Sequence, residues 1–152
     1  MQVFIAGIMQ ADRADRLIES QTYREQIGAA LRRHVADVQI VDPWLLNPNS
    51  VEYEDEQARQ TFFSLTRRAR EADLLIAYLP KPSMGTAMEM WEAYHGGAYI
   101  VAVTPFRHHW AVRFVANEIL PDIETLLVAI ENGRLPHIVA QYRAVDAPSQ
   151  AD

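Results

Sequence analysis

The residues best suited to chemistry lie in one short stretch, residues 80–90, which follows an apolar run and opens a helical one. At such a strand-to-helix junction, backbone amides and side chains point toward a ligand crevice. Ser83 and the amides near Gly85, that of Met84 included, can hold a hydroxyl, phosphate or carboxylate group there. Glu89, one turn into the helix, can project over the same crevice. A carboxylate in that position can attack an electrophilic sugar carbon and later leave as a glycosyl ester, which is the covalent route of retaining glycosyl transfer.

The same glutamate also has a purely structural interpretation. Thr86 and Glu89 have the spacing of a capping box, in which an N-cap threonine and a glutamate three residues later satisfy each other's backbone amides. On spacing alone, this structural role is the favoured one. Asp73, which precedes the apolar run at 74–79, is interpreted as an edge residue or a loop hydrogen-bond acceptor and is given no catalytic role.

A second candidate loop follows the first apolar run and begins with Gly7 and Ile8. A glycine lets the backbone turn sharply, so that amides at a helix start can face a ligand, although a strand-ending turn explains Gly7 equally well. The loop lacks the three-glycine spacing of a dinucleotide fingerprint, and no glycine- and lysine-containing phosphate loop occurs. We therefore expect no nicotinamide or flavin cofactor.

These loops need a scaffold, and the hydrophobic pattern predicts one. Short apolar runs alternate with longer amphipathic ones, as in parallel sheets whose strands are linked by covering helices. Strands are predicted at residues 3–6, 38–41, 74–79 and 99–103. Helices are predicted at residues 14–33, 52–71, 86–95, 110–120 and 122–132. The expected fold is α/β, a Rossmann-like three-layer sandwich with four or five mostly parallel strands, whose ligand lies at their carboxyl ends. We expect a single domain over residues 1–145 and a flexible tail at 146–152.

Composition limits the classes of partner. The chain has 152 residues, a formal net charge of −6 and no cysteine. Negative charge argues against binding to a nucleic-acid polymer, which depends on clustered lysine and arginine. The absence of cysteine excludes disulfides, thiolate zinc sites and cysteine nucleophiles. Because the sequence shows neither a basic leader nor an apolar run of bilayer length, we expect a soluble cytoplasmic protein with no membrane partner.

The chain resembles the nucleoside 2-deoxyribosyltransferase superfamily, which includes deoxynucleoside monophosphate N-glycosidases and cytidylate hydrolases. The resemblance rests on residues 4–7, on residues 72–78, and on residues 83–85 followed by Glu89. It implies that Glu89 is the nucleophile that displaces the base from the anomeric carbon. It also implies that Ser83 and Gly85 lie beside the sugar or its 5′ substituent.

The resemblance further implies a homo-oligomer with shared active sites. Members of the superfamily bind substrate with residues of a neighbouring subunit that follow the fourth strand, which here are residues 106–110. His109 and Trp110 are therefore predicted to contact the nucleoside. An indole is as often a plain interface or core anchor, and paired histidines are as often surface residues. No metal is predicted at His108 and His109, because adjacent residues rarely share one ion and no third ligand lies near them in sequence.

Two positions depart from the superfamily's pattern. Phe4 stands where many members have a tyrosine that hydrogen-bonds the nucleophile, and Leu65 stands where many have an aspartate. Either another polar group replaces these partners or the substrate differs. The candidate replacements are Tyr78, Tyr53 and Asp42. Asp42, at the carboxyl end of the second predicted strand, is also a predicted substrate contact, although an Asp-Pro turn explains it equally well.

The leading hypothesis is glycosyl transfer between a 2′-deoxyribonucleoside and a free nucleobase. Glu89 attacks the anomeric carbon, the base departs with proton assistance, and a second base resolves the ester without a metal or cofactor. Resolution by water would make the protein a nucleoside or nucleotide N-glycosidase. Lys81 is the only cation near Ser83 in sequence, which favours nucleosides. The alternatives are a non-catalytic nucleoside- or nucleotide-binding module, and an oligomeric scaffold with a crevice filled by Met9, Met84 and Met88.

Overall fold

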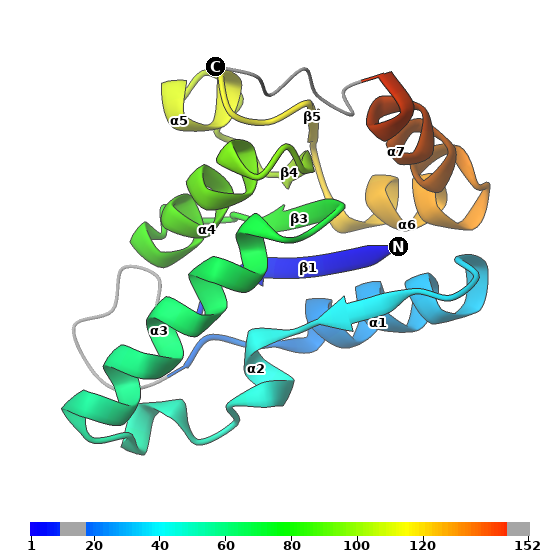
Figure 1. Ribbon diagram of the computed structural model, residues 1–152. Helices are drawn as coiled ribbons and strands as arrows, with labels where there is room; N and C mark the ends of the chain where they lie inside the picture. Colours follow the sequence, from blue (N-terminus) through cyan, green and yellow to red (C-terminus); the bar gives the residue numbers. More distant parts are fainter. Residues whose placement is uncertain (10–17, 146–152) are drawn as a thin grey trace.

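The computed structural model describes residues 1–9 and 18–145, which form a five-stranded sheet covered by helices (Figure 1). Every strand pairing in this sheet is parallel. From edge to edge the strands are β2 (Gln39–Val41), β1 (Gln2–Gly7), β3 (Leu74–Tyr78), β4 (Tyr99–Val103) and β5 (Glu118–Leu120). The predicted Rossmann-like α/β fold is therefore confirmed.

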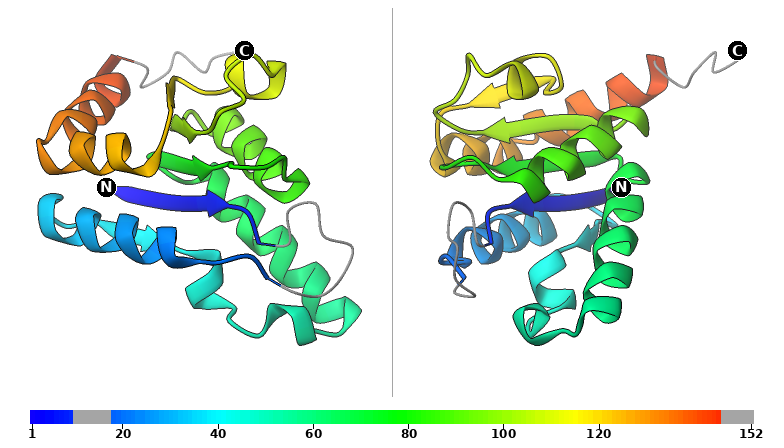
Figure 2. Two further views of the ribbon diagram at one scale, coloured as in Figure 1. Left: turned by 180° about the vertical axis from the view of Figure 1, so that it is seen from behind. Right: turned by 90° about the vertical axis from the view of Figure 1, so that its left-hand side faces the viewer.

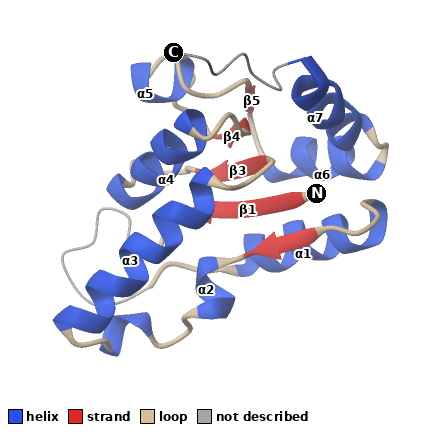
Figure 3. Ribbon diagram, viewed as in Figure 1, coloured by secondary structure: helices blue, strands red, loops and turns tan. Residues whose placement is uncertain are grey.

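Helices lie on both faces of the sheet and complete three layers (Figure 2, Figure 3). One face is covered by α1 (Thr22–His34), α6 (Ile123–Glu131) and α7 (Arg134–Val145). The other is covered mainly by α3 (Asp55–Arg70) and α4 (Met84–His95). Short helices α2 (Pro43–Leu46) and α5 (Trp110–Arg113) and a 3₁₀ turn at Ser50–Glu52 complete the connections.

The alternating side chains of β1 divide the core into two layers. Val3 and Ile5 pack toward α1 and α6, whereas Phe4 and Ala6 pack toward α4, and all four are fully buried. A sheet buried on both faces has strands that are apolar at every position. This is why β1, β3 and β4 were recognisable in the sequence as apolar runs.

Asp73 has the edge role that its position suggested. Its carboxylate accepts a hydrogen bond from the backbone N–H of Gln2 at 2.6 Å and pairs with Arg143 of α7. The side chain therefore ties the start of β1 to the last helix, at the end of the sheet opposite the predicted ligand crevice.

The helix predicted at 14–33 begins later than expected. Residues 18–21 are not helical and α1 starts at Thr22, while residues 14–17 lie outside the described part of the chain. The side-chain amide of Gln21 donates to the carbonyls of Ile8 and Glu19, at 3.1 and 2.8 Å. These bonds hold the chain in a turn before the helix.

The helix predicted at 110–120 was wrong in its second half. Helix α5 ends at Arg113, and residues 118–120 form β5, which pairs with Val101 to Val103 of β4. Asn117 fixes this pairing, since its side chain accepts from the N–H of Ile100 and its own N–H donates to the Ile100 carbonyl. A three-residue edge strand has too little pattern to be distinguished from a helix by periodicity.

Helix α7 was not predicted, because the helix at 122–132 followed by Gly133 was interpreted as the last one. Pro136 lies in the first turn of α7, where a missing N–H costs no helical hydrogen bond. None of the helices within residues 1–9 and 18–145 has the length and apolarity required to cross a bilayer. The tail predicted at 146–152 lies outside the described residues, and the domain boundary at 145 stays a prediction.

Candidate functional site

Helix α4 begins at Met84, with Ser83 as its N-cap. The Ser83 hydroxyl accepts from the backbone N–H of Thr86 at 3.4 Å and from the Thr86 hydroxyl at 3.1 Å. The capping box predicted from Thr86 and Glu89 is therefore wrong, because Thr86 lies inside the helix and the true cap is three residues earlier. Glu89 lies beyond the first turn and is free of any role in starting the helix.

Glu89 instead lines a pocket of about 300 Å³, which we call the site pocket. The pocket brings together several of the residues predicted from sequence, namely Gly7, Ser83, Met84, Gly85 and Glu89. Met9 and the α3 side chains Phe62, Leu65 and Thr66 form the rest of the described lining, with Thr86 beside Ser83. Residues far apart in the sequence thus converge on one carboxyl group.

The site pocket lies at the switch point of the sheet. The chain leaves β1 for β2 through α1 on one face and reaches β3 through α3 on the other face, so the connections diverge between β1 and β3. Gly7 ends β1, and Ser83 follows the carboxyl end of β3. Ligands of open α/β sheets bind in the crevice at this position.

The environment of Glu89 makes its carboxyl group a weaker acid than an exposed glutamate. The side chain is partly buried, and burial raises the pKa of Glu89 from its ordinary value of 4.5 to about 8, while the positive charge of Arg24 opposes the rise. Near neutral pH such a group is divided between acid and carboxylate. A pocket carboxyl with so perturbed a pKa is typical of a catalytic acid, base or nucleophile.

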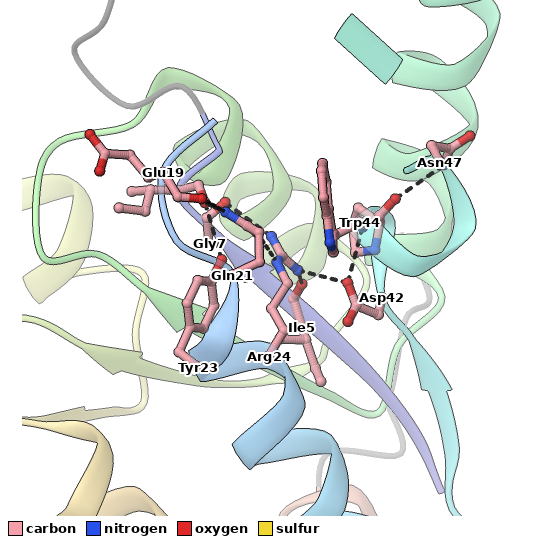
Figure 4. A network of polar contacts seen from close by, with 11 residues as sticks. Ile5, Gly7, Glu19, Gln21, Tyr23, Arg24, Asp42, Trp44 and Asn47 are labelled. Carbon is pink, nitrogen blue, oxygen red and sulfur yellow. Dashed lines mark hydrogen bonds and ion pairs between the residues drawn. The ribbon is translucent and has the colours of Figure 1, made fainter. Parts of the chain in front are cut away.

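Arg24 of α1 lies buried beside the site, and sequence analysis did not predict a functional role for it. Its side chain is 2% exposed and makes four hydrogen bonds (Figure 4). Nη1 donates to the carbonyl of Ile5 and to the Asp42 carboxylate at 3.1 Å, and Nη2 donates to the Gly7 carbonyl at 3.2 Å. Nε donates to the side-chain oxygen of Gln21 at 2.7 Å.

Asp42 is engaged with Arg24 and does not line the site pocket. Its carboxylate is 3% exposed and also accepts from the backbone N–H of Trp44 at 3.0 Å, which caps α2. Asp42 is therefore placed to hold Arg24, and it is not among the described residues that line the site pocket.

Tyr23 explains why position 7 is glycine. A Cβ atom at Gly7 would lie 2.3 Å from the Tyr23 hydroxyl oxygen, closer than real atoms approach. That hydroxyl donates to the Ile8 carbonyl at 3.2 Å. Burial raises the pKa of Tyr23, so the phenol stays neutral, and the charge of Glu89 adds to the effect. Sequence reasoning missed Tyr23 because an aromatic residue in an amphipathic helix is ordinarily a core residue.

Ile8 is buried and is not among the described residues that line the site pocket. Its N–H donates to the Tyr78 carbonyl at 3.3 Å, and its carbonyl accepts from Tyr23 and Gln21. Tyr78 packs against Tyr23, with ring centroids 4.4 Å apart, and lines a separate hollow with Thr104 and Pro121. Both polar groups of the Ile8 backbone are thus used within the protein.

A second, mostly apolar hollow of about 330 Å³ adjoins the site pocket, and we call it the side chamber. Met9, Phe62 and Leu65 line both spaces. Leu65 therefore lies between them. Tyr53 reaches the side chamber, where its hydroxyl donates to Asn47 at 3.4 Å. No lysine, arginine, aspartate or glutamate is found among the described residues that line the side chamber.

His109 and Trp110 lie away from the site pocket of their own chain. His109 precedes α5 and contacts the Phe106 ring, and Trp110 is 78% exposed. Their predicted contact with the substrate of a neighbouring copy stays a prediction. Within residues 1–9 and 18–145, no group of three or more histidine, aspartate or glutamate side chains is placed to hold a metal ion.

Solved structures with the same fold include enzymes that act on nucleosides or nucleotides. A 2-deoxyribosyltransferase of Bacillus psychrosaccharolyticus superposes with a TM-score of 0.61 at 14% identity, covering 84% of this chain and 90% of that one. The chain shares the fold of a 2-deoxyribosyltransferase. A conserved protein of Enterococcus faecalis V583 gives 0.60 at 19% identity, with 87% and 98% covered. The CMP N-glycosidase BcmB of Clostridium botulinum gives 0.50 at 16% identity, with 87% and 98% covered.

No protein-family model matches the chain, and no curated protein matches its sequence. At identities of 14–19%, the solved structures establish the fold, and the site must be argued from this chain's own residues.

Proposed function

We propose that the protein transfers the glycosyl group of a nucleoside from one base to another through a covalent ester on Glu89. The observation that carries the proposal is the position of Glu89, whose carboxyl group lines a pocket at the switch point of the sheet instead of capping α4. The solved 2-deoxyribosyltransferase and CMP N-glycosidase with this fold support the same class of chemistry.

The reaction has two displacements at the anomeric carbon. A Glu89 carboxylate oxygen forms a bond to that carbon while the bond to the base nitrogen breaks, and its electron pair leaves with the base, which takes up a proton. A nitrogen of a second base then attacks the same carbon, loses its proton, and releases the carboxylate. Two displacements retain the configuration of the sugar.

The two hollows suit the two halves of a nucleoside. The site pocket, with hydroxyl groups from Ser83 and Thr86, takes the sugar next to Glu89. The side chamber, with an apolar lining and the polar groups of Asn47 and Tyr53, takes the base. Apolar walls with a few hydrogen-bonding groups are typical of sites for flat aromatic ligands.

The lining favours nucleosides over nucleotides. No lysine or arginine lines either hollow among the described residues, and Lys81 pairs with Glu19 at 3.2 Å. A phosphate group is ordinarily bound by such cations. An N-glycosidase acting on nucleosides is the second candidate, since it needs only water in place of the second base.

Two of the three methionines of the scaffold alternative do not fill the crevice. Met84 is 86% exposed and Met88 is 48% exposed, whereas Met9 lines the site pocket, which still has a volume of about 300 Å³. A non-catalytic binding module remains the alternative in the event that no turnover is found.

We further propose that the protein is a homo-oligomer. Large apolar side chains are exposed along the helices of one face of the sheet and on α5. They are Phe62, Phe63, Met88, Trp91, Tyr94, Trp110 and Phe114. An apolar surface of this extent is typical of a protein interface. In the proposed oligomer, a second copy packs over α3 and α4 and contributes its His109 and Trp110 to the shared site.

Base exchange tests the proposed function. Purified protein is incubated with deoxyinosine plus adenine or cytosine, and separately with deoxyinosine or a deoxynucleotide alone, with products followed by chromatography. Exchange that is absent in Glu89→Gln and intact in Glu131→Gln, an exposed glutamate at the end of α6, supports a transferase. Free base without exchange supports the N-glycosidase, and no turnover over a broad panel contradicts both.

Subunit complementation tests the oligomer. Light scattering gives the mass in solution, and a monomer at working concentrations contradicts the shared site. Glu89→Gln and Trp110→Ala proteins are then mixed after mild dissociation. Partial recovery of activity is expected, because a mixed dimer holds one site with Glu89 from one chain and Trp110 from the other.

A further inference from the structure

Strand β2 ends before β1 does, and the Arg24 side chain bonds the carbonyls of β1 that β2 does not reach. The pairing of β1 with β2 runs from Gln2 to Phe4, which faces Val41. Beyond Phe4, the carbonyls of Ile5 and Gly7 still point toward the β2 side, because alternate residues of a strand point the same way. These are the two carbonyls that accept from the Arg24 guanidinium. Arg24 thus completes the hydrogen bonding of β1 where no strand remains to do so.

This arrangement puts a fixed positive charge against the site pocket. Gly7, whose carbonyl Arg24 holds, is itself part of the pocket lining with Glu89. The guanidinium is almost fully buried, so water screens its field weakly. Its position is fixed by bonds to two backbone carbonyls, Gln21 and Asp42.

Among the described residues that face Glu89, Arg24 carries the dominant charge. The described side chains that α3 contributes to the pocket, Phe62, Leu65 and Thr66, do not ionise, and neither do Ser83 and Thr86. From α1, the Tyr23 phenol stays neutral and is occupied with the Ile8 carbonyl. Asp42 is negative and in contact with Arg24, so it reduces the field that Arg24 exerts.

We propose that Arg24, held in place by Asp42, is the positioning residue that stabilises the ionised carboxylate of Glu89 before it attacks the sugar. The inference rests on the proposed role of Glu89 as nucleophile. Substrate binding excludes water from the pocket and would by itself favour the neutral acid. A buried cation that cannot move away keeps the reactive form populated, and Asp42 sets how strongly it does so.

The test measures the titration of Glu89 directly, without catalysis. Protein labelled with ¹³C at the glutamate carboxyl carbons is titrated by NMR, and the Glu89 signal is assigned from its absence in Glu89→Gln. Asp42→Asn removes the opposing charge yet keeps an oxygen for the bonds to Arg24 and Trp44. Its Glu89 midpoint is expected to fall by about 1 pH unit, because loss of the Asp42 charge leaves the field of Arg24 unopposed.

Two further variants separate charge from packing. The pair Arg24→Met with Asp42→Asn removes both charges without leaving a buried charge unpaired, and its Glu89 midpoint is expected to rise above the wild-type value. Arg24→Lys keeps the charge and is expected to stay near wild type. Circular dichroism checks that Asp42→Asn is folded, since this variant leaves the buried charge of Arg24 without its ionic partner. The same midpoint in wild type and in folded Asp42→Asn would overturn the proposal.

Activity then distinguishes this inference from the proposed function. The lower limb of kcat/KM against pH is expected to move with the NMR midpoint in each variant. If the midpoints move as predicted but no variant and no wild-type protein turns over nucleosides, the proposed function fails and the role of Arg24 stands. If exchange is found and the midpoints do not move, the proposed function stands and the role of Arg24 fails.

Discussion

The hydroxyl of Tyr23 fills the space that a side chain at position 7 would need. A Cβ atom on Gly7 would lie 2.3 Å from that oxygen and 2.8 Å from the ring carbon that bears it. The close approach holds the end of β1 against α1, on the rim of the pocket that contains Glu89. The glycine is therefore explained by its neighbour, independently of any ligand.

Gly7→Ala is expected to destabilise the protein by about 1–3 kcal/mol, the usual effect of forcing a methyl group into a packed interior. Tyr23→Phe removes the atom nearest to the added methyl group. The double variant is therefore expected to lose less stability than the sum of the losses in the two single variants. Urea denaturation measures both. Gly85→Ala is the matched control, because nothing lies within 4 Å of its added Cβ and alanine suits a helix. Equal losses at positions 7 and 85 would contradict the steric account.

The ionisation of Glu89 should make stability depend on pH. Its pKa is about 8 in the folded protein and near 4.5 when exposed, so between these values the folded state binds the extra proton. The free energy of unfolding of wild type should therefore fall as pH rises from about 4.5 to 8, relative to Glu89→Gln. We expect a difference of roughly 1–3 kcal/mol, given partial solvent screening. Parallel curves for the two proteins over this window would show that Glu89 is not held in a desolvated site.

The same ionisation predicts the direction of the pH–rate profile. A nucleophilic carboxylate must be deprotonated, so kcat/KM should rise with pH and level off above about 8. Steady-state rates of base release from pH 5 to pH 9 measure this limb. A rate that instead falls as pH passes 8 would assign Glu89 the role of general acid.

Ser83 is expected to affect both stability and substrate binding. Ser83→Ala removes the hydroxyl that caps α4, which should cost about 1 kcal/mol of stability. Because the same hydroxyl lines the site pocket, KM should rise as well. Asp122→Ala removes the corresponding cap of α6, outside the site pocket, and is expected to leave KM unchanged. An unchanged KM in Ser83→Ala would limit Ser83 to its role in the helix.

Much of the fold could be predicted from the sequence because the three central strands, β1, β3 and β4, are buried on both faces. Val3 to Ala6 and Leu74 to Ala77 are buried at every position, which leaves an unbroken apolar run in the sequence. The edge strand β5 has no such run, and its pairing depends on Asn117, a contact across the chain. The start of α4 was misplaced because Ser83 and Thr86 are both good N-cap residues, and local spacing cannot choose between them.

Sequence analysis predicted only those site residues that lie in short segments directly after a strand. Gly7, Ser83, Met84, Gly85 and Glu89 come from loops and a helix start at strand ends, and they do line one pocket. Arg24 was not predictable, since an arginine in an amphipathic helix normally faces water. Arg24 is buried because β2 ends three residues before the end of β1 and leaves space for its side chain. This difference in strand length is visible only in the folded sheet.

The covalent ester on Glu89 is the central claim, and mass spectrometry tests it most directly. The protein is mixed with deoxyinosine without a second base, quenched in acid, digested, and its peptides are compared with those of Glu89→Gln. We predict a deoxyribosyl addition on the peptide that contains residue 89 in wild type and none in the variant. An addition at another residue, or base release from deoxyinosine with no adduct at any time point, would contradict the assignment of Glu89 as the nucleophile.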